Sequence, residues 1–157
     1  MATFQIKLKT NINKMMNKVK ENLIKEVDTR VLRAFQMASK EIVEWAKTNH
    51  GYTQQTGNLN ASTGFNLYKD GDLINTSFGS SRLEGDTIGA QVAAERESEL
   101  SGSYRIATIV VAGMNYAIHV ENMGFDVLAG AELRFPDVLT KWLQKAFEGT
   151  GISAMVE

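Results

Sequence analysis

Cysteine is absent from this 157-residue sequence, and several kinds of site are excluded with it. Disulfides, metal sites with thiolate ligands and cysteine nucleophiles all need a residue that the chain lacks. Histidine occurs only twice, as His50 and His119, and neither stands in a spacing typical of metal ligands. We therefore expect no cofactor and no metal, although a site made of carboxylates alone stays open.

Long apolar runs are missing as well. No segment approaches the ~20 apolar residues that a membrane-spanning helix needs. The opening MATFQIKLKTN has no apolar core of the length found in signal peptides. We therefore expect a protein that is made and used in a soluble compartment, with no membrane partner. The chain has the size of one domain, and no repeat or linker divides residues 1–157.

The charges nearly cancel over the whole chain but are unevenly placed. The formal net charge of −1 gives no overall attraction to nucleic acid or membrane. Residues 1–50 hold ten basic and five acidic side chains, whereas residues 51–157 hold seven basic and thirteen acidic ones. Such asymmetry can bring copies of a protein, or oppositely charged partners, into register. Two independent solvated faces would explain it equally well.

The first third of the chain changes from a strand-like to a helical pattern. Residues 3–9 alternate apolar and polar side chains, which predicts an extended arm over 1–10. Apolar residues then recur every three or four positions, which predicts one long helix over 11–49. Such a helix, at ~1.5 Å per residue, exceeds what one small domain covers. Either it bends near Asp28-Thr29, or part of its apolar face packs against another chain, which we favour. The stripe comprises Ile12, Met16, Val19, Leu23, Val27, Val31, Ala34, Ala38, Ile42 and Trp45.

The remaining residues predict an antiparallel sheet and two more helices. Strand patterns over 62–112 include STGFNLYK and LINTSFGS around an Asp70-Gly71 turn, and DTIGAQVAAER with SYRIATIVVAG as a second pair. A short helix over 115–123 would be capped by Asn115, and 125–135 would form an irregular loop. The only proline, Pro136, suits the first turn of a C-terminal helix over 136–148. The predicted class is α+β, with the long helix packed on the sheet.

A search for catalytic chemistry finds little. A hydrolase that uses His119 and Glu121 is conceivable, but a lone histidine near a carboxylate is more often a surface residue. The stretch TGNLNASTG lacks the lysine of a phosphate-binding loop and follows a predicted helix rather than a strand. We therefore predict that the chain is not an enzyme.

Three short motifs stand in a fixed order after the long helix: TGNL, YAIHVENMG and FP. Their order resembles that in the tail-completion and head–tail joining proteins of tailed bacteriophages. The matching residues are Thr56, Gly57, Asn58, Leu59, Tyr116, Ala117, Val120, Glu121, Gly124, Phe135 and Pro136. The chain departs from the family pattern at Asn60-Ala61-Ser62, where an Arg-Ser pair is common. The glycine after Glu121 also comes one residue later than usual, so the following loop is expected to differ.

The resemblance implies a structural virion protein that forms a ring in the neck, or connector, between the DNA-filled head and the tail. The implied partners are further copies of the chain, portal or adaptor proteins, tail proteins, and DNA that passes through the channel without sequence-specific binding. The implied location is the virion, with the host cytoplasm during assembly. The alternative from the residues themselves is a small soluble module that binds nucleic acid, through the lysine-rich N-terminal region, or protein.

The chemistry of TGNL suits a joint between the long helix and the sheet. Thr56 and Asn58 can satisfy backbone groups left open at the helix-to-strand junction. Gly57 permits a turn that other residues disfavour, and Leu59 can anchor that turn in the core. We expect Tyr116 and Glu121 to serve a second junction in the same way.

Overall fold

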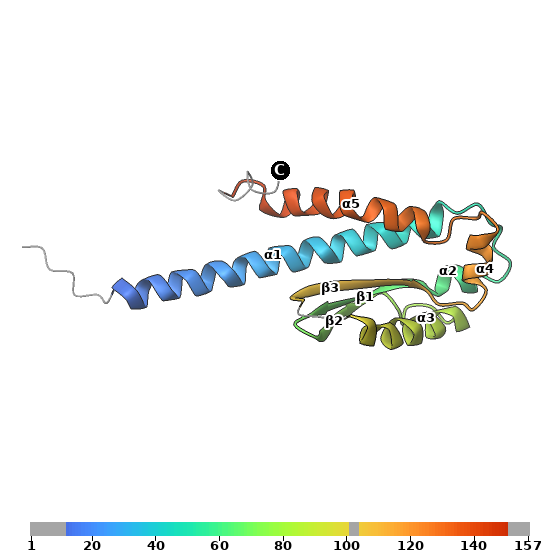
Figure 1. Ribbon diagram of the computed structural model, residues 1–157, viewed down its shortest axis with the longest axis horizontal. Helices are drawn as coiled ribbons and strands as arrows, with labels where there is room; N and C mark the ends of the chain where they lie inside the picture. The colour runs from blue at the N-terminus through green and yellow to red at the C-terminus, as the bar shows by residue number, and fades with distance from the viewer. Residues whose placement is uncertain (1–11, 101–103, 151–157) are drawn as a thin grey trace, which may run out of the picture.

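The structure is a computed structural model that describes residues 12–100 and 104–150, so the arm expected over 1–10 lies outside the described residues. A long helix, a three-stranded antiparallel sheet and a C-terminal helix confirm the α+β class (Figure 1). In chain order the elements are α1 (Ile12–Thr48), α2 (Asn58–Ala61), β1 (Thr63–Lys69), β2 (Asp72–Thr76), α3 (Glu84–Glu95), the 3-10 turn η1 (Arg96–Glu99), β3 (Ile106–Ala112), α4 (Ala117–Asn122) and α5 (Ala129–Phe147).

Helix α1 runs unbroken for 37 residues, so no break occurs at Asp28-Thr29. It ends at Thr48, one residue before the predicted end at residue 49. The side chains of Thr48 and Asn49 donate hydrogen bonds to carbonyl groups of the last turn. Thr48 Oγ1 donates to Glu44 O at 2.9 Å, and Asn49 Nδ2 donates to Trp45 O at 3.0 Å. These side chains compete for the carbonyls that a further helical turn would use, and the helix ends there.

The sheet has the strand order β2-β1-β3, and both pairings are antiparallel. The predicted Asp70-Gly71 hairpin is confirmed, with φ of 51° and 93° at the two turn residues. The central strand β1 is buried on both faces. On one face Phe65 and Leu67 pack with Ile42 of α1, and on the other α3 covers the sheet.

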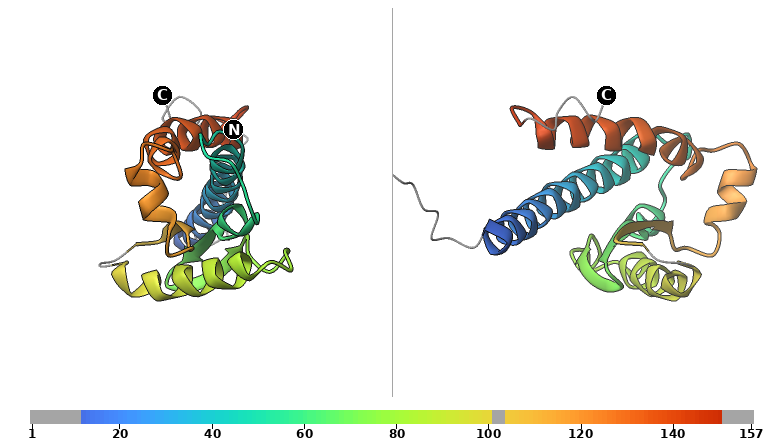
Figure 2. Two further views of the ribbon diagram at one scale, coloured as in Figure 1. Left: turned by 90° about the vertical axis from the view of Figure 1, so that its right-hand side faces the viewer. Right: turned by 60° about the vertical axis from the view of Figure 1, so that its left-hand side comes forward.

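The elements therefore form layers. Helices α1 and α5 lie antiparallel on one side of the sheet, and α3 lies on the other, as the end-on view in Figure 2 shows. The core between α1, α5 and the sheet holds fully buried side chains from three elements. A smaller cluster of Phe78, Ala93 and Val111 fills the space between the sheet and α3.

The prediction that DTIGAQVAAER forms a strand was wrong, because Glu84–Glu95 form helix α3. Ile88 and Val92 do alternate with polar residues locally, yet they are also four residues apart and lie on one face of a helix. Ala93 becomes fully buried against the sheet. Since β3 is apolar on both of its faces, a second covering layer was needed, and α3 supplies it.

The boundaries expected around the last helix were also wrong. Helix α5 begins at Ala129, within the expected loop, and Pro136 lies inside it rather than in its first turn. The missing N–H of proline removes one helical hydrogen bond there. The helix nevertheless starts early because carboxylates bind its first N–H groups, with Asp126 Oδ1 accepting from Gly130 N at 2.9 Å. The prediction that Asn115 caps the short helix was wrong as well. Tyr116 stands at the start of α4, and no side chain caps the helix there.

Candidate assembly surfaces

The TGNL motif forms the turn between α1 and the sheet. Gly57 has a φ of 76°, in the left-handed region that glycine adopts without strain, as expected. Thr56 Oγ1 accepts the N–H of Asn58 at 3.3 Å, and the side chain of Leu59 is only 5% exposed. The geometry is that of a structural joint.

The structure brings the second motif against the first, although the two lie far apart in the sequence. Leu59, Ala117 and Val127 share one buried cluster, and Val120 packs against it. Thr56, Gly57, Asn58 and Leu59 line, together with Tyr116 and Val120, a hollow of about 690 Å³. Tyr116 is 38% exposed. We call this region the motif junction.

Glu121 ties the motif junction to α5. Its carboxylate accepts N–H groups from Val127 at 3.0 Å, Leu128 at 2.9 Å and Ala129 at 3.1 Å. A carboxylate at this place satisfies donors that the start of a helix leaves open and opposes the positive end of the helix dipole. Gly124, between α4 and this loop, is exposed. Glu121 therefore has a structural task.

Asp86, on the α3 side of the sheet, also binds backbone N–H groups with its carboxylate. The sequence patterns did not predict this role. Its buried carboxylate accepts the N–H groups of Gly79 at 3.1 Å and Ser81 at 2.8 Å, and so fixes the loop before α3. An acidic residue in the first turn of a helix is a recognisable signal. The strand interpretation of this segment concealed it.

The third motif lies elsewhere. Phe135 and Pro136 of α5 line a cleft of about 770 Å³ that runs beside β3 and is lined by no residue of the first two motifs. The opposite wall comes from the end of α3, η1 and Leu100. We call it the β3-edge cleft. The three motifs thus divide between two places in the fold.

The geometry offers little to the hydrolase alternative. His119 is exposed on α4, whereas the Glu121 carboxylate binds the N–H groups of the loop before α5. His50 is stacked on Tyr52, with ring centroids 3.9 Å apart, and its Nδ1 lies 3.0 Å from Tyr52 O. Burial raises the pKa of the Tyr52 hydroxyl to about 12. Within the described residues no cluster of three metal-ligating side chains occurs, and no helix is long and apolar enough to cross a membrane.

The N-terminal part of α1 extends beyond the body of the molecule (Figure 1). We call Ile12–Glu26 the projecting segment; every one of its residues is exposed. Its large apolar side chains retain between 42% and 59% of their exposure, and they are Ile12, Met15, Met16, Val19, Leu23 and Ile24. The stripe that is buried from Ala34 onward continues here without a cover from the described chain.

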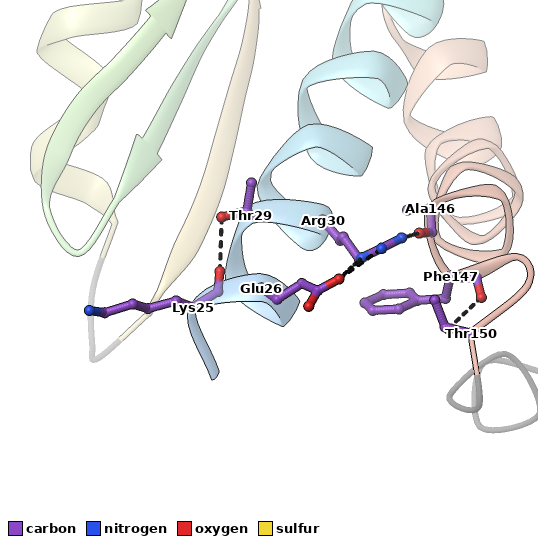
Figure 3. A network of polar contacts seen from close by, with 7 residues as sticks. All are labelled: Lys25, Glu26, Thr29, Arg30, Ala146, Phe147 and Thr150. Carbon is purple, nitrogen blue, oxygen red and sulfur yellow. Dashed lines mark hydrogen bonds and ion pairs between the residues drawn. The ribbon is translucent and has the colours of Figure 1, made fainter. Parts of the chain in front are cut away.

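The boundary between the buried and projecting parts of α1 is marked by polar contacts (Figure 3). Arg30 Nη1 donates to the carbonyl of Ala146 at 2.7 Å, in the last turn of α5. The same guanidinium pairs with Glu26 at 2.8 Å. On the sheet side Asp28 pairs with Arg105 and, at 3.8 Å, with Lys69. Both α5 and the sheet therefore end near this turn of α1.

Comparison with protein-family models, with curated proteins and with solved structures gives no match for this chain. The resemblance to the phage family therefore rests on the motifs themselves. The joint at TGNL and its contact with the second motif are consistent with a shared structural task for the two segments.

Proposed function

We propose that this chain is a structural subunit of a phage neck, where copies of it form a ring between head and tail and leave a channel for DNA. The projecting segment is the observation that carries the proposal. A helix that leaves six large apolar side chains exposed in the isolated chain needs a further surface to bury them. The order of the TGNL, YAIHVENMG and FP motifs along the chain supports a phage neck ring over other homo-oligomers.

The charge distribution supports contacts between copies. Lysines outnumber glutamates by four to two in the projecting segment, whereas α3 and η1, on the other side of the sheet, hold five acidic residues and one arginine. A basic surface that meets an acidic one in the next copy favours a heterologous contact, which closes into a ring when the rotation permits. The proposed role needs no catalytic step, cofactor or metal.

Light scattering at several protein concentrations, combined with electron microscopy of the particles, tests the proposal. We expect mass to grow with concentration into a discrete oligomer, and images to show closed rings. Raising the salt to ~0.5 M, where charges are screened within several Å, should weaken the assembly. A protein that stays monomeric and binds DNA tightly would contradict the proposal.

A nucleic-acid-binding module is the second candidate, and the four lysines of the projecting segment favour it. Lysines on an exposed helix can neutralise phosphates, and affinity would then fall steeply with rising salt. Titration of a fluorescent duplex into the protein at two salt concentrations separates the candidates. The module predicts a monomer or dimer with salt-sensitive affinity for DNA, whereas the ring subunit predicts assembly without DNA.

A further inference from the structure

We propose that the projecting segment of one copy docks into the β3-edge cleft of the next. This inference rests on the proposed assembly of copies and names the contact through which they join. The contact would bury two surfaces against each other that the isolated chain leaves exposed. One is an apolar helix face, and the other is an apolar cleft beside the edge of β3 that no described strand pairs with.

The helix face is continuous and of the right shape for a groove. Ile12, Met16, Val19 and Leu23 follow steps of three and four residues, so their side chains form one ridge. Met15 widens the ridge, and methionine adapts to irregular surfaces. Polar side chains border it, with Lys20 on one flank and Asn22 on the other.

The cleft is lined mainly by apolar side chains, and backbone groups of β3 lie along it. Gly113 donates to Ser62 O and Asp70 to Arg105 O, so alternate residues of β3 direct their backbone groups toward β1. The residues between them, which include Thr108 and Val110, direct their backbone groups outward. Within the described chain no strand pairs with this side. A docked helix flanked by Lys20 and Asn22 would cover the edge and offer it polar partners.

Acidic side chains stand on both walls of the cleft, whereas the projecting segment is rich in lysine. The projecting segment has four lysines and two glutamates, whereas the charged residues that line the cleft are Glu99, Glu132 and Arg96. Glu99 on the η1 wall pairs with Arg96, and Glu132 stands on the α5 wall; both carboxylates are exposed. The rims therefore present carboxylates to an incoming lysine-rich helix.

The occupant has to come from another copy. Helix α1 is unbroken from Ile12 to Thr48, so the projecting segment cannot fold back onto the cleft of its own chain. It points away from the sheet, as the views in Figures 1 and 2 agree. A contact between two different surfaces of identical copies is heterologous, and it propagates from copy to copy until a ring closes.

The first test removes the ridge without changing charge. In Val19→Gln/Leu23→Gln two exposed apolar side chains become polar in a residue type that favours helix. We expect association to weaken by about a hundredfold, because two large side chains lose their burial. Asn13→Gln/Asn17→Gln, on another face of the same segment, is the matched control and should assemble like the unmodified protein. Sedimentation velocity measures all three.

The second test asks which surface receives the ridge. Glu99→Lys/Glu132→Lys places positive charge on both rims of the cleft while the ridge stays intact, and should be monomeric. Mixed with Val19→Gln/Leu23→Gln, it should form a one-to-one complex, since one protein contributes the ridge and the other the cleft. A further change of Lys20→Glu, on the flank of the ridge, should partly restore the assembly of the rim variant by exchanging the charges. Thermal melting of each variant verifies its fold.

Three results would overturn the inference. Undiminished rings from Val19→Gln/Leu23→Gln would show that copies join elsewhere, and the proposed function would survive. Self-association of the rim variant through its ridge would show that ridges pair with each other. An unmodified protein that remains monomeric at all concentrations would remove the contact altogether, and a salt-sensitive affinity for the DNA duplex in that same sample would remove the proposed function with it.

Discussion

The two halves of α1 share one apolar pattern, but one half is buried and the other is exposed. From Ala34 to Ala46 the apolar stripe is buried, with Ala38 fully inaccessible and Ile42 only 2% exposed. Toward the N-terminus the same spacing continues, yet Val19 and Leu23 remain 56% and 52% exposed. The difference lies in what stands opposite, because the sheet and α5 both end near Arg30. Periodicity tells which face of a helix is apolar, and only the neighbouring elements tell whether the chain itself covers it.

The contrast predicts a large difference between truncations in the two halves. Ile42→Ala removes a side chain from the core formed with Phe65 and Leu67, and should lower the free energy of unfolding by about 2–5 kcal/mol. Val19→Ala should change it by less than about 0.5 kcal/mol in the monomer, since that side chain is exposed. Urea denaturation of dilute protein measures both. Similar losses would mean that the projecting half is already covered in the monomer.

Arg30 marks the boundary, and its loss should cost less than a core truncation. The guanidinium donates to Ala146 O in the last turn of α5, where a cation and a donor are both favourable (Figure 3). We expect Arg30→Ala to destabilise the fold by about 1–2 kcal/mol. Lys20→Ala, in the projecting segment, serves as the control and should be neutral in monomeric protein. An Arg30→Ala variant as stable as the unmodified protein would show that the end of α5 does not depend on this contact.

A hydroxyl in each half offers a smaller comparison. Ser39 Oγ lies 2.9 Å from Thr108 Oγ1 and is fully buried between α1 and β3, whereas the hydroxyl of Thr29 donates only to Lys25 O of its own helix. Ser39→Ala should cost about 1 kcal/mol, since Thr108 keeps its bond to Asn66 O. Thr29→Ala should cost almost nothing, or gain slightly from helix propensity. Equal effects in chemical denaturation would contradict the assigned burial.

How far the sequence alone reaches depends on whether a signal is local. The stripe of α1 and the Asp70-Gly71 turn carry their own structure, and both were predicted. The α3 segment was misassigned because Thr87 to Val92 alternate as a strand would, and the helix is selected by packing on the sheet. The early start of α5 depends on Glu121, a residue of another element, and no local pattern reports it.

The candidate surfaces follow the same rule. The TGNL turn could be interpreted from its residues, since glycine and short hydroxyl or amide side chains favour turns. Its contact with Ala117 and Val120 could not be predicted, because that contact depends on the path of the chain through the sheet. The β3-edge cleft was wholly hidden, since one of its walls is the misassigned α3 and the other is the part of α5 expected to be a loop. A surface made from three elements appears only once all three are placed.

The smallest effect expected is a pH dependence at the buried half of α1. Glu41 accepts from Lys141 Nζ at 2.7 Å and Trp142 Nε1 at 2.8 Å, and the hydrogen bond from Lys141 is the main cause that lowers the pKa of Glu41 from its ordinary 4.5. A carboxylate with a lowered pKa in the folded state stabilises the fold above pH 4.5 and loses that contribution as the pH falls through the folded value. The pair is substantially exposed, so we expect Glu41→Gln to cost less than about 1 kcal/mol at neutral pH and nothing near about pH 3. Glu44→Gln, an exposed change on the same helix, is the control, and urea denaturation at both pH values is the measurement. A cost of Glu41→Gln that persists unchanged in acid would show that packing against Trp142, rather than the charge, holds α5 on α1.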